Sequence, residues 1–218
     1  MKLYDQVFLT GCDKNTEWMI PWFIKNYKKH NKTPLIFANF GLSEIGLNHI
    51  SAFAHEIIDL TKTKEKGWFK KPQAIIEATK ISRKVCWLDT DCEVLADLSD
   101  IFTYTESGKI GMVEDKPWSK RRGETWHNTG VVVVEGYPVI LQEWLAMVRN
   151  NPRIGDQEVL HAFLRQDMRR HVYVTDLPEE YNWVRLNLVD GRDNKRKKVM
   201  HWTGQKGKMH IEEATRYG

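Results

Sequence analysis

The first two-fifths of the chain alternates short apolar runs with longer segments in which apolar residues recur at helical spacing. The runs predict strands at about residues 6–10, 35–39, 57–60 and 85–88. Helices are predicted between them, over residues 16–30 and 72–82, the second with Pro72 in its first turn. Strands that alternate with helices are typical of a parallel sheet with helices on its faces.

The pattern is looser in the rest of the chain. It predicts strands near residues 110–113 and 130–134, and helices over residues 138–149 and 156–165. No internal repeat or low-complexity linker interrupts these elements. We therefore expect one α/β domain over residues 1–218, with a mostly parallel central sheet flanked by helices.

Two segments, residues 115–125 and 190–198, are basic and rich in turn-forming residues. The simpler interpretation is that both are solvated loops. The alternative is that they form a pair of mobile lids over an anionic ligand.

Composition limits the class of protein. A chain of 218 residues with 41% hydrophobic residues can bury a sizeable core. The net charge of +4 permits an anionic substrate but does not indicate a protein that wraps nucleic acid. The three cysteines, Cys12, Cys86 and Cys92, form no CxxC pair, which argues against a zinc knuckle or a disulfide framework and favours a reducing, cytoplasmic location.

The N-terminus does not resemble a signal peptide, because Asp5 and Gln6 interrupt its apolar stretch. The most apolar segment, residues 18–24, is broken by Pro21 and is too short to span a bilayer. We expect a soluble cytoplasmic protein without a membrane segment.

The strongest chemical signal is the pair Asp89 and Asp91, which follows the predicted buried strand at residues 85–88. Both side chains point the same way if the strand geometry continues past Leu88. Two converging carboxylates repel each other unless a cation lies between them, and oxygen ligands suit Mg²⁺ or Mn²⁺. The pair therefore predicts a divalent-metal site at the end of a strand.

Further polar motifs occur both before and after this pair along the chain. They are Gly11-Cys12-Asp13-Lys14-Asn15 after the first strand, Asn128-Thr129-Gly130, Asp156-Gln157, Tyr181-Asn182 and His201-Trp202-Thr203-Gly204. Together with the Asp-x-Asp pair, this order resembles the nucleotide-sugar glycosyltransferases of the GT-A fold, and most nearly the glycogenin-like family, glycosyltransferase family 8. The resemblance runs from about residue 6 to residue 208.

The resemblance implies a Rossmann-like GT-A domain that transfers a sugar from a UDP-sugar with the help of Mn²⁺ or Mg²⁺. Asp89, Asp91 and His201 match the metal ligands, and Asp13 and Asn15 match the residues that hold the uracil. The residues that it places at the nucleotide-sugar are Thr10, Gly11, Cys12, Asp13, Asn15, Lys71, Asp89, Thr90, Asp91, Asn128, Gly130, Gly204, Lys206 and Lys208. Lys71 is expected near the donor phosphates, and Asn128 and Gly130 in a turn at the donor sugar.

The catalytic residues implied by the resemblance are Gln157 and Asp156, with Gln157 near the anomeric carbon. An amide at this position favours a transferase that retains the anomeric configuration, whereas Asp156 or Glu158 as a base would favour inversion. The acceptor is open: a saccharide, a protein side chain or a modified nucleobase.

The chain departs from the family pattern near its C-terminal end. Gly207 stands where the family has a lysine, and no Pro-Trp pair follows. Lys206 or Lys208 could supply the missing cation from a neighbouring position.

Other interpretations remain open at this stage. Asp156 could be only a helix N-cap, Lys71 only a helix-start residue, and His201 only a core histidine. The Asp-x-Asp pair also occurs in haloacid dehalogenase-type phosphatases, but Glu93 does not fit that pattern. Lysines and arginines at 120–122 and 195–198 would also suit a non-catalytic module that binds a nucleotide or nucleic acid.

Overall fold

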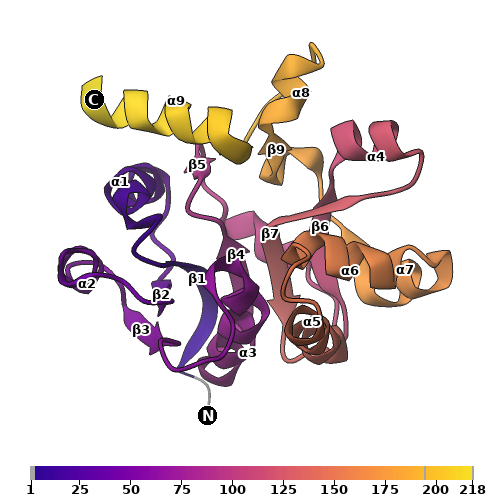
Figure 1. Ribbon diagram of the computed structural model, residues 1–218, viewed down its shortest axis with the longest axis horizontal. Helices are drawn as coiled ribbons and strands as arrows, with labels where there is room; N and C mark the ends of the chain where they lie inside the picture. Colours follow the sequence, from indigo (N-terminus) through magenta and orange to yellow (C-terminus); the bar gives the residue numbers. More distant parts are fainter. Residues whose placement is uncertain (1–2, 194, 218) are drawn as a thin grey trace.

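A seven-stranded sheet runs through the middle of the protein, with its strands in the order β3-β2-β1-β4-β7-β6-β8 (Figure 1). The computed structural model describes residues 3–193 and 195–217. The strands of this sheet are β1 (Tyr4–Cys12), β2 (Leu35–Asn39), β3 (Glu56–Asp59), β4 (Ser82–Leu88), β6 (Ile110–Glu114), β7 (His127–Glu135) and β8 (Val174–Asp176).

The predicted parallel half of the sheet is confirmed. β1 pairs in parallel with both β2 and β4, and β2 pairs in parallel with β3. β7 then runs antiparallel to both β4 and β6, while β8 is parallel to β6. The sheet is therefore mostly parallel, and β7 is the strand that reverses its direction.

Helices cover both faces of the sheet (Figure 1). On one face, α3 (Lys71–Ile81), α5 (Val139–Asn150) and α6 (Asp156–Leu164) share a core with Val7, Leu9 and Trp87. On the other face, α1 (Ile20–His30) and α2 (Glu44–Ser51) share a core with Phe8 and Cys86. Neighbouring residues of β1 thus enter opposite cores, as the alternation of side chains along a strand requires.

A second, three-stranded sheet lies beyond the end of β4. It has the order β5-β10-β9 and consists of β5 (Cys92–Val94), β10 (Val199–His201) and β9 (Trp183–Val184). β5 follows β4 after only three residues, and its pairing with β10 places His201 opposite Cys92. This short sheet brings the C-terminal part of the chain to the carboxyl end of the central strands.

The remaining α-helices are short, apart from the C-terminal one. They are α4 (Lys116–Arg122), α7 (Asp167–Tyr173), α8 (Arg185–Val189) and the C-terminal α9 (Gly204–Tyr217), with 3₁₀ turns η1 (Glu17–Met19), η2 (Gly67–Lys70), η3 (Ser99–Tyr104) and η4 (Glu179–Tyr181). No helix among residues 3–193 and 195–217 is long and apolar enough to cross a membrane. Cys12, Cys86 and Cys92 are buried and free.

Two sequence predictions need correction. The helix expected from residue 16 begins as an α-helix only at Ile20, after a 3₁₀ turn, and Thr16 makes no capping hydrogen bond. The segment at residues 115–125 is not a structureless loop, because it contains α4. Asp115 accepts a hydrogen bond from the Trp118 N–H at the start of this helix, and Gly123 ends it in the left-handed conformation.

The second basic segment, residues 190–198, lies between α8 and β10 and contains no helix or strand where it is described. Asn194 of this predicted loop lies outside the described residues. Most other predicted elements differ from the observed ones by only one or two residues at their ends, which is the usual uncertainty of element boundaries.

Candidate active site

The register between β4 and β7 builds the first part of the site. Leu88, the last residue of β4, lies opposite Val131 of the antiparallel β7, so the residues before Val131 extend past the end of β4. The Asp89 N–H donates to the carbonyl of Gly130 at 2.8 Å. Asn128, Thr129 and Gly130 therefore lie beside the carboxylate pair, although they are about 40 residues away in sequence.

Asp89 and Asp91 do not continue the strand, contrary to the prediction. The Cys92 N–H bonds to the carbonyl of Asp89 at 3.0 Å, which closes a tight turn between β4 and β5. Both carboxylates nevertheless line the same cavity. The turn, not the alternation of a strand, brings them together.

His201 approaches the pair from β10. Its Nε2 lies 3.1 Å from Oδ1 of Asp91 and 3.9 Å from Oδ2 of Asp89. The side chain is buried, and a Cβ on Gly130 would overlap with its ring. Gly130 is part of strand β7 and not of a turn as predicted, and its lack of a side chain makes room for the imidazole.

A chain of hydrogen bonds sets the tautomer of His201. The Gly130 N–H donates to Oδ1 of Asn128 at 2.8 Å, which fixes the orientation of that amide. The same oxygen accepts from Nδ2 of Asn182 at 2.9 Å, so Oδ1 of Asn182 faces Nδ1 of His201 at 3.0 Å. Because Asn182 Oδ1 can only accept, Nδ1 of His201 must carry a proton. Nε2 is then the nitrogen available to a metal.

This arrangement fits a divalent cation. In neutral His201, Nε2 and the nearby Asp91 oxygen are both acceptors, so a proton or a metal ion must lie between them. Burial lowers the pKa of His201, but the adjacent Asp91 outweighs this effect and raises it above its ordinary value. The buried thiol of Cys92 also lies in this cluster. Burial keeps the pKa of this thiol well above its ordinary value, and Mg²⁺ and Mn²⁺ prefer oxygen and imidazole ligands to sulfur, so Asp89, Asp91 and His201 are the better donor set.

Lys71 connects the carboxylate pair to α6. Its ammonium group is buried, lies 2.9 Å from Asp89 and 3.2 Å from Asp156, and donates to the carbonyl of Thr129 at 3.0 Å. Burial lowers the pKa of Lys71, but Asp156 and Asp89 outweigh it and raise the pKa, so the amine is charged. Asp156 is not the N-cap of α6, because Gly155 occupies that position. Both residues are therefore part of the ionic network, not only helix-start residues.

Gln157 is held by the backbone of β7. Its Oε1 accepts the Thr129 N–H at 3.1 Å, and the Thr129 hydroxyl donates to Asp156 at 3.2 Å. The amide oxygen of Gln157 accepts this hydrogen bond, so its NH₂ group lies on the side of the amide away from the Thr129 N–H. Sequence analysis assigned no role to Thr129, which contacts Lys71, Asp156 and Gln157.

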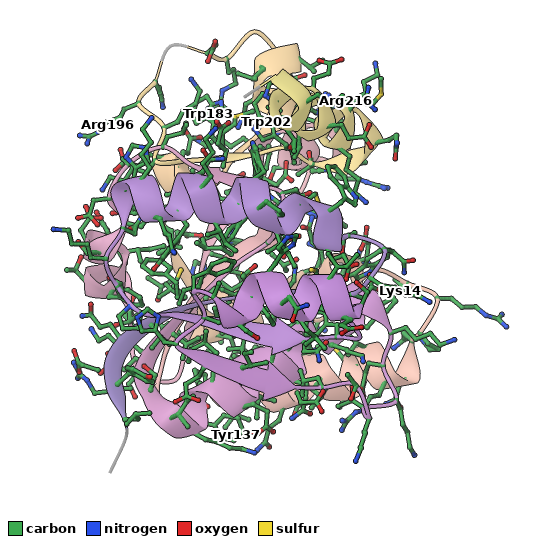
Figure 2. The ribbon with its side chains drawn as sticks, turned by 90° about the vertical axis from the view of Figure 1, so that its left-hand side faces the viewer. Lys14, Tyr137, Trp183, Arg196, Trp202 and Arg216 are labelled. Carbon is green, nitrogen blue, oxygen red and sulfur yellow. The ribbon has the colours of Figure 1, made fainter. Side chains whose placement is uncertain are left out.

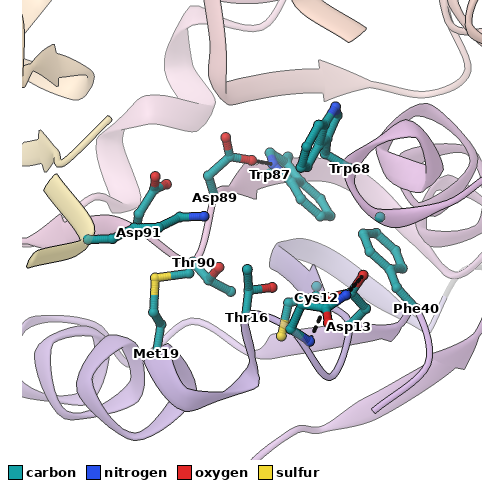
Figure 3. Close-up of a pocket in the computed structure, with 14 residues that line it drawn as sticks. Cys12, Asp13, Thr16, Met19, Phe40, Trp68, Trp87, Asp89, Thr90 and Asp91 are labelled. Carbon is teal, nitrogen blue, oxygen red and sulfur yellow. Dashed lines mark hydrogen bonds between the residues drawn. The ribbon is translucent and has the colours of Figure 1, made fainter. Parts of the chain in front are cut away.

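A cavity of about 270 Å³ lies on one side of the carboxylates (Figure 3). Asp91 and Asp13 lie at its opposite ends, and the backbone and side chain of Asn15 donate to Asp13 at 2.9 and 3.3 Å. The lining residues predicted from the sequence are Gly11, Cys12, Asp13, Asn15, Asp89, Thr90, Asp91 and Lys208.

Two aromatic residues of this cavity, Trp87 and Phe40, were not assigned from the sequence, whereas Trp68 is one of the tryptophans expected to stack on a sugar or base. Trp87 donates from Nε1 to Asp89 at 2.6 Å and stacks with Phe40, with 6.1 Å between the ring centroids. Trp68, whose side chain is largely exposed, lines the cavity wall. Thr10 does not line the cavity: it is fully buried in β1, which continues to Cys12.

A second cavity, of about 390 Å³, shares Trp68, Asp89 and Asp91 with the first. It is lined by Lys71, Asp115, Trp118, Asn128, Thr129, Asp156, Gln157, Glu158, His201 and Gly204, among others. The carboxylate pair thus stands at the junction of two cavities. One reaches the loop after β1, and the other reaches the start of α6.

The altered C-terminal motif has a structural explanation. Gly207 in α9 packs against the backbone of Trp202, and any Cβ there would overlap with the Trp202 carbonyl oxygen. Lys208, the next residue, lines the first cavity, whereas Lys206 is exposed and lines neither cavity. Of the two candidates for the missing cation, the structure brings only Lys208 to the site.

No family model matches this chain, and no curated protein matches it. Solved structures do match. The galactosyltransferase LgtC, in complex with donor and acceptor sugar analogues, has a TM-score of 0.65 and 14% identity over 96% of this chain and 94% of that one. The glycosyltransferase GlyE of Streptococcus pneumoniae TIGR4 has a TM-score of 0.69 and 18% identity, with 93% of this chain and 55% of that chain covered, so the chain spans about half of GlyE.

A third structure is of a glycosyltransferase involved in the glycosylation of the major capsid of PBCV-1. It has a TM-score of 0.59 and 13% identity, and 97% of this chain and 99% of that one are covered. The mostly parallel sheet, its helical layers and its strand-end site correspond to the architecture expected from the sequence. This chain has the GT-A-like fold of these glycosyltransferases.

Proposed function

We propose that this protein is a metal-dependent glycosyltransferase that transfers a sugar from a UDP-sugar to an acceptor hydroxyl. One observation carries the proposal: Asp89, Asp91 and His201 converge at the junction of two cavities in a chain with a glycosyltransferase fold. A donor with a nucleoside at one end, a diphosphate in the middle and a sugar at the other end suits this layout.

Asp89, Asp91 and His201 would hold Mn²⁺ or Mg²⁺. A bound cation of this kind stabilises negative charge on the leaving diphosphate as a Lewis acid. Asn182 accepts a hydrogen bond from Nδ1–H of His201, which leaves Nε2 as the nitrogen that can coordinate the ion. Lys208, which lines the same cavity, adds positive charge near the diphosphate.

The first cavity would bind the nucleoside. Asp13 holds a fixed orientation through its hydrogen bonds from Asn15, and its carboxylate can accept a further hydrogen bond from the imide N–H of uracil. Trp68 and Phe40 offer aromatic faces in the same cavity. The hydrogen bond to Asp13 supports UDP over ADP, because adenine has no ring N–H to donate there.

The second cavity would hold the donor sugar and the acceptor hydroxyl. Gln157 lines it, and its side chain is too weakly basic to remove a proton by itself, which supports retention of the anomeric configuration. Asp156 is a poor candidate for the base of an inverting reaction, because its carboxylate is buried and its Oδ2 contacts both Lys71 and Thr129. Lys71 lines the same cavity, where its charge positions Asp89 and Asp156 beside the donor phosphates.

The decisive experiment incubates the protein with a panel of nucleotide sugars and Mn²⁺ and measures nucleoside diphosphate release. Release from a UDP-sugar only, and its loss with a chelator, is the expected result. Binding of nucleotides without release would support the non-catalytic binding module instead. The fold favours the transferase over the phosphatase alternative, and release of inorganic phosphate from phosphate monoesters would reverse that preference.

A further inference from the structure

Positive charge is concentrated on two neighbouring segments beside the second cavity. Residues 115–125 and 190–198 together carry a net charge of +5, which exceeds the +4 of the whole chain. The segments contact each other, because Arg121 of α4 bonds to Asp190 at 2.8 and 3.2 Å. Figure 1 shows α4 and α8 side by side at this end of the protein.

These segments enclose a hollow of about 470 Å³. It is lined by Lys116, Pro178, Glu179, Glu180, Trp183, Lys195 and Arg196. Figure 2 shows Arg196 reaching outward from the end of the molecule that also holds Trp183. The helix α4 separates this hollow from the second cavity: Trp118 lines the cavity, and Lys116 lines the hollow.

The cations of the hollow outnumber its carboxylates. Glu179 pairs with Lys116, with Arg192 at 2.9 Å and with Lys195 at 3.1 Å. Glu180, the other carboxylate of the lining, pairs with Lys198, so Glu179 alone faces these three cations. Arg196 is exposed and makes no ion pair with another described residue. Burial raises the pKa of Glu179, but its hydrogen bonds from Lys116, Arg192 and Lys195 outweigh this and lower it to about 2. Glu179 is therefore ionised at neutral pH and offsets one positive charge, and the remaining cations leave the hollow with a net positive charge.

We propose that this hollow binds a phosphate group of the acceptor, and that the acceptor is a phosphorylated saccharide. The inference rests on the proposed glycosyltransferase function and specifies the substrate class of the same site. A saccharide whose phosphate lies in the hollow extends across α4 toward the second cavity. Trp118 lines that cavity, and its ring can pack against the sugar. Its hydroxyl can then enter the cavity that holds Gln157.

The number of available cations favours a small anionic group over nucleic acid. Other cations of the basic segments are already paired: Lys198 with Asp100 and with Glu180, the latter at 3.3 Å, and Lys197 with Asp193. Proteins that bind a nucleic acid backbone commonly contact about 6–10 phosphates. The hollow has Arg196 and three further cations that share the single carboxylate of Glu179, which matches one phosphate group.

The test is calorimetric titration with glucose 6-phosphate and N-acetylglucosamine 6-phosphate, each compared with its neutral parent sugar, in the presence of UDP and Mn²⁺ to fill the donor site. Inorganic phosphate and a single-stranded oligonucleotide are titrated in parallel. The test variant is Lys195→Ala/Arg196→Ala. The matched control is Lys29→Ala/Lys32→Ala, which removes two exposed cations at the end of α1.

We expect the phosphorylated sugars to bind about tenfold more tightly than their parents, and the test variant to lose this difference while the control keeps it. Arg196→Lys should retain the preference, because it keeps the charge. Equal binding of parent and phosphorylated sugars, no effect of the test variant, or equal affinity for inorganic phosphate would overturn the proposal. Tighter binding of the oligonucleotide would overturn it in favour of a nucleic acid acceptor.

A second measurement distinguishes failure of the transferase proposal from failure of the phosphorylated-acceptor proposal. UDP release from UDP-sugars in the absence of any acceptor tests the transferase and should be the same in Lys195→Ala/Arg196→Ala as in the wild type. If no donor is turned over, the transferase proposal fails, and a sugar-phosphate preference that disappears in the test variant still reports an anion site in the hollow.

Discussion

The backbone of Gly207 in α9 packs so closely against the carbonyl oxygen of Trp202 that no Cβ fits between them. This contact explains why the chain lacks a lysine at a position where the sequence comparison led us to expect one. It also fixes the direction in which α9 leaves β10, and thereby places Lys208 at the first cavity.

Gly207→Ala should destabilise the protein. Alanine within a helix normally stabilises it by up to about 1 kcal/mol relative to glycine. Here the overlap with Trp202 should reverse the sign and cost about 1–3 kcal/mol. Urea denaturation measures the difference, and Lys206→Ala on the exposed side of the same helix is the control that should change little. A stabilised Gly207→Ala variant would refute the packing.

UDP binding should require a divalent cation and both carboxylates. Asp91→Asn or addition of a chelator should weaken UDP binding about a hundredfold, because Asp89 and Asp91 repel a diphosphate when no cation lies between them. Calorimetry with and without Mn²⁺ provides the measurement. Asp5→Asn is the control, since this carboxylate pairs with Arg83 at the other end of β1. Equal affinity with Mn²⁺ and with a chelator would remove the metal site.

The sequence predicted those parts of the fold that have strong local patterns. The buried runs of β1, β2 and β4 are too apolar for exposed segments, and the helices between them force a parallel arrangement. The carboxylate pair was predicted from its position after a buried strand, and His201 and Gln157 from the resemblance of their motifs to those of the glycosyltransferases. Each of these signals is carried by residues that are close together in sequence.

The remaining features depend on contacts between distant residues. β5 and β10 have three residues each, too few for a periodic pattern, yet their pairing brings His201 to Asp91. Asn182 orients His201 only because Asn128 orients Asn182, and no local motif reveals such a chain. The bridge from Lys71 to Asp156 is equally invisible in the sequence, because each residue alone looks like a helix start.

Lys71→Met should destabilise the protein by about 3–5 kcal/mol, because it leaves the buried carboxylate of Asp156 without a cation. The double variant Lys71→Met/Asp156→Asn removes both charges and should recover part of the loss. Equilibrium denaturation of the two single variants and the double variant completes the cycle. Additive effects of the two substitutions would show that the ion pair contributes nothing to stability.

Glu179 should stabilise the protein in a pH-dependent manner. Its pKa is about 2 in the folded protein, against an ordinary value of 4.5, because the hydrogen bonds from its three cationic partners outweigh the effect of burial. A lowered pKa gives stability that is fully present above the ordinary value and is lost as the pH falls toward the folded one. The wild type should therefore exceed Glu179→Gln in unfolding free energy by about 1 kcal/mol near neutral pH, and the difference should shrink between pH 4.5 and pH 2. A difference that is constant over this range would contradict the assignment.

Gln157→Ala should slow sugar transfer at least about tenfold while metal-dependent UDP binding stays nearly unchanged, because Gln157 lines the second cavity but not the nucleotide cavity. Glu158→Gln is the informative companion, since Glu158 lines the same cavity and is the remaining candidate base for an inverting reaction. In a retaining enzyme, Glu158→Gln leaves most of the activity intact, and an α-linked donor gives an α-linked product. Proton NMR of the anomeric signal reads the configuration directly. A β-linked product, together with loss of transfer in Glu158→Gln, would assign the base to Glu158 and leave the metal site and the fold unaffected.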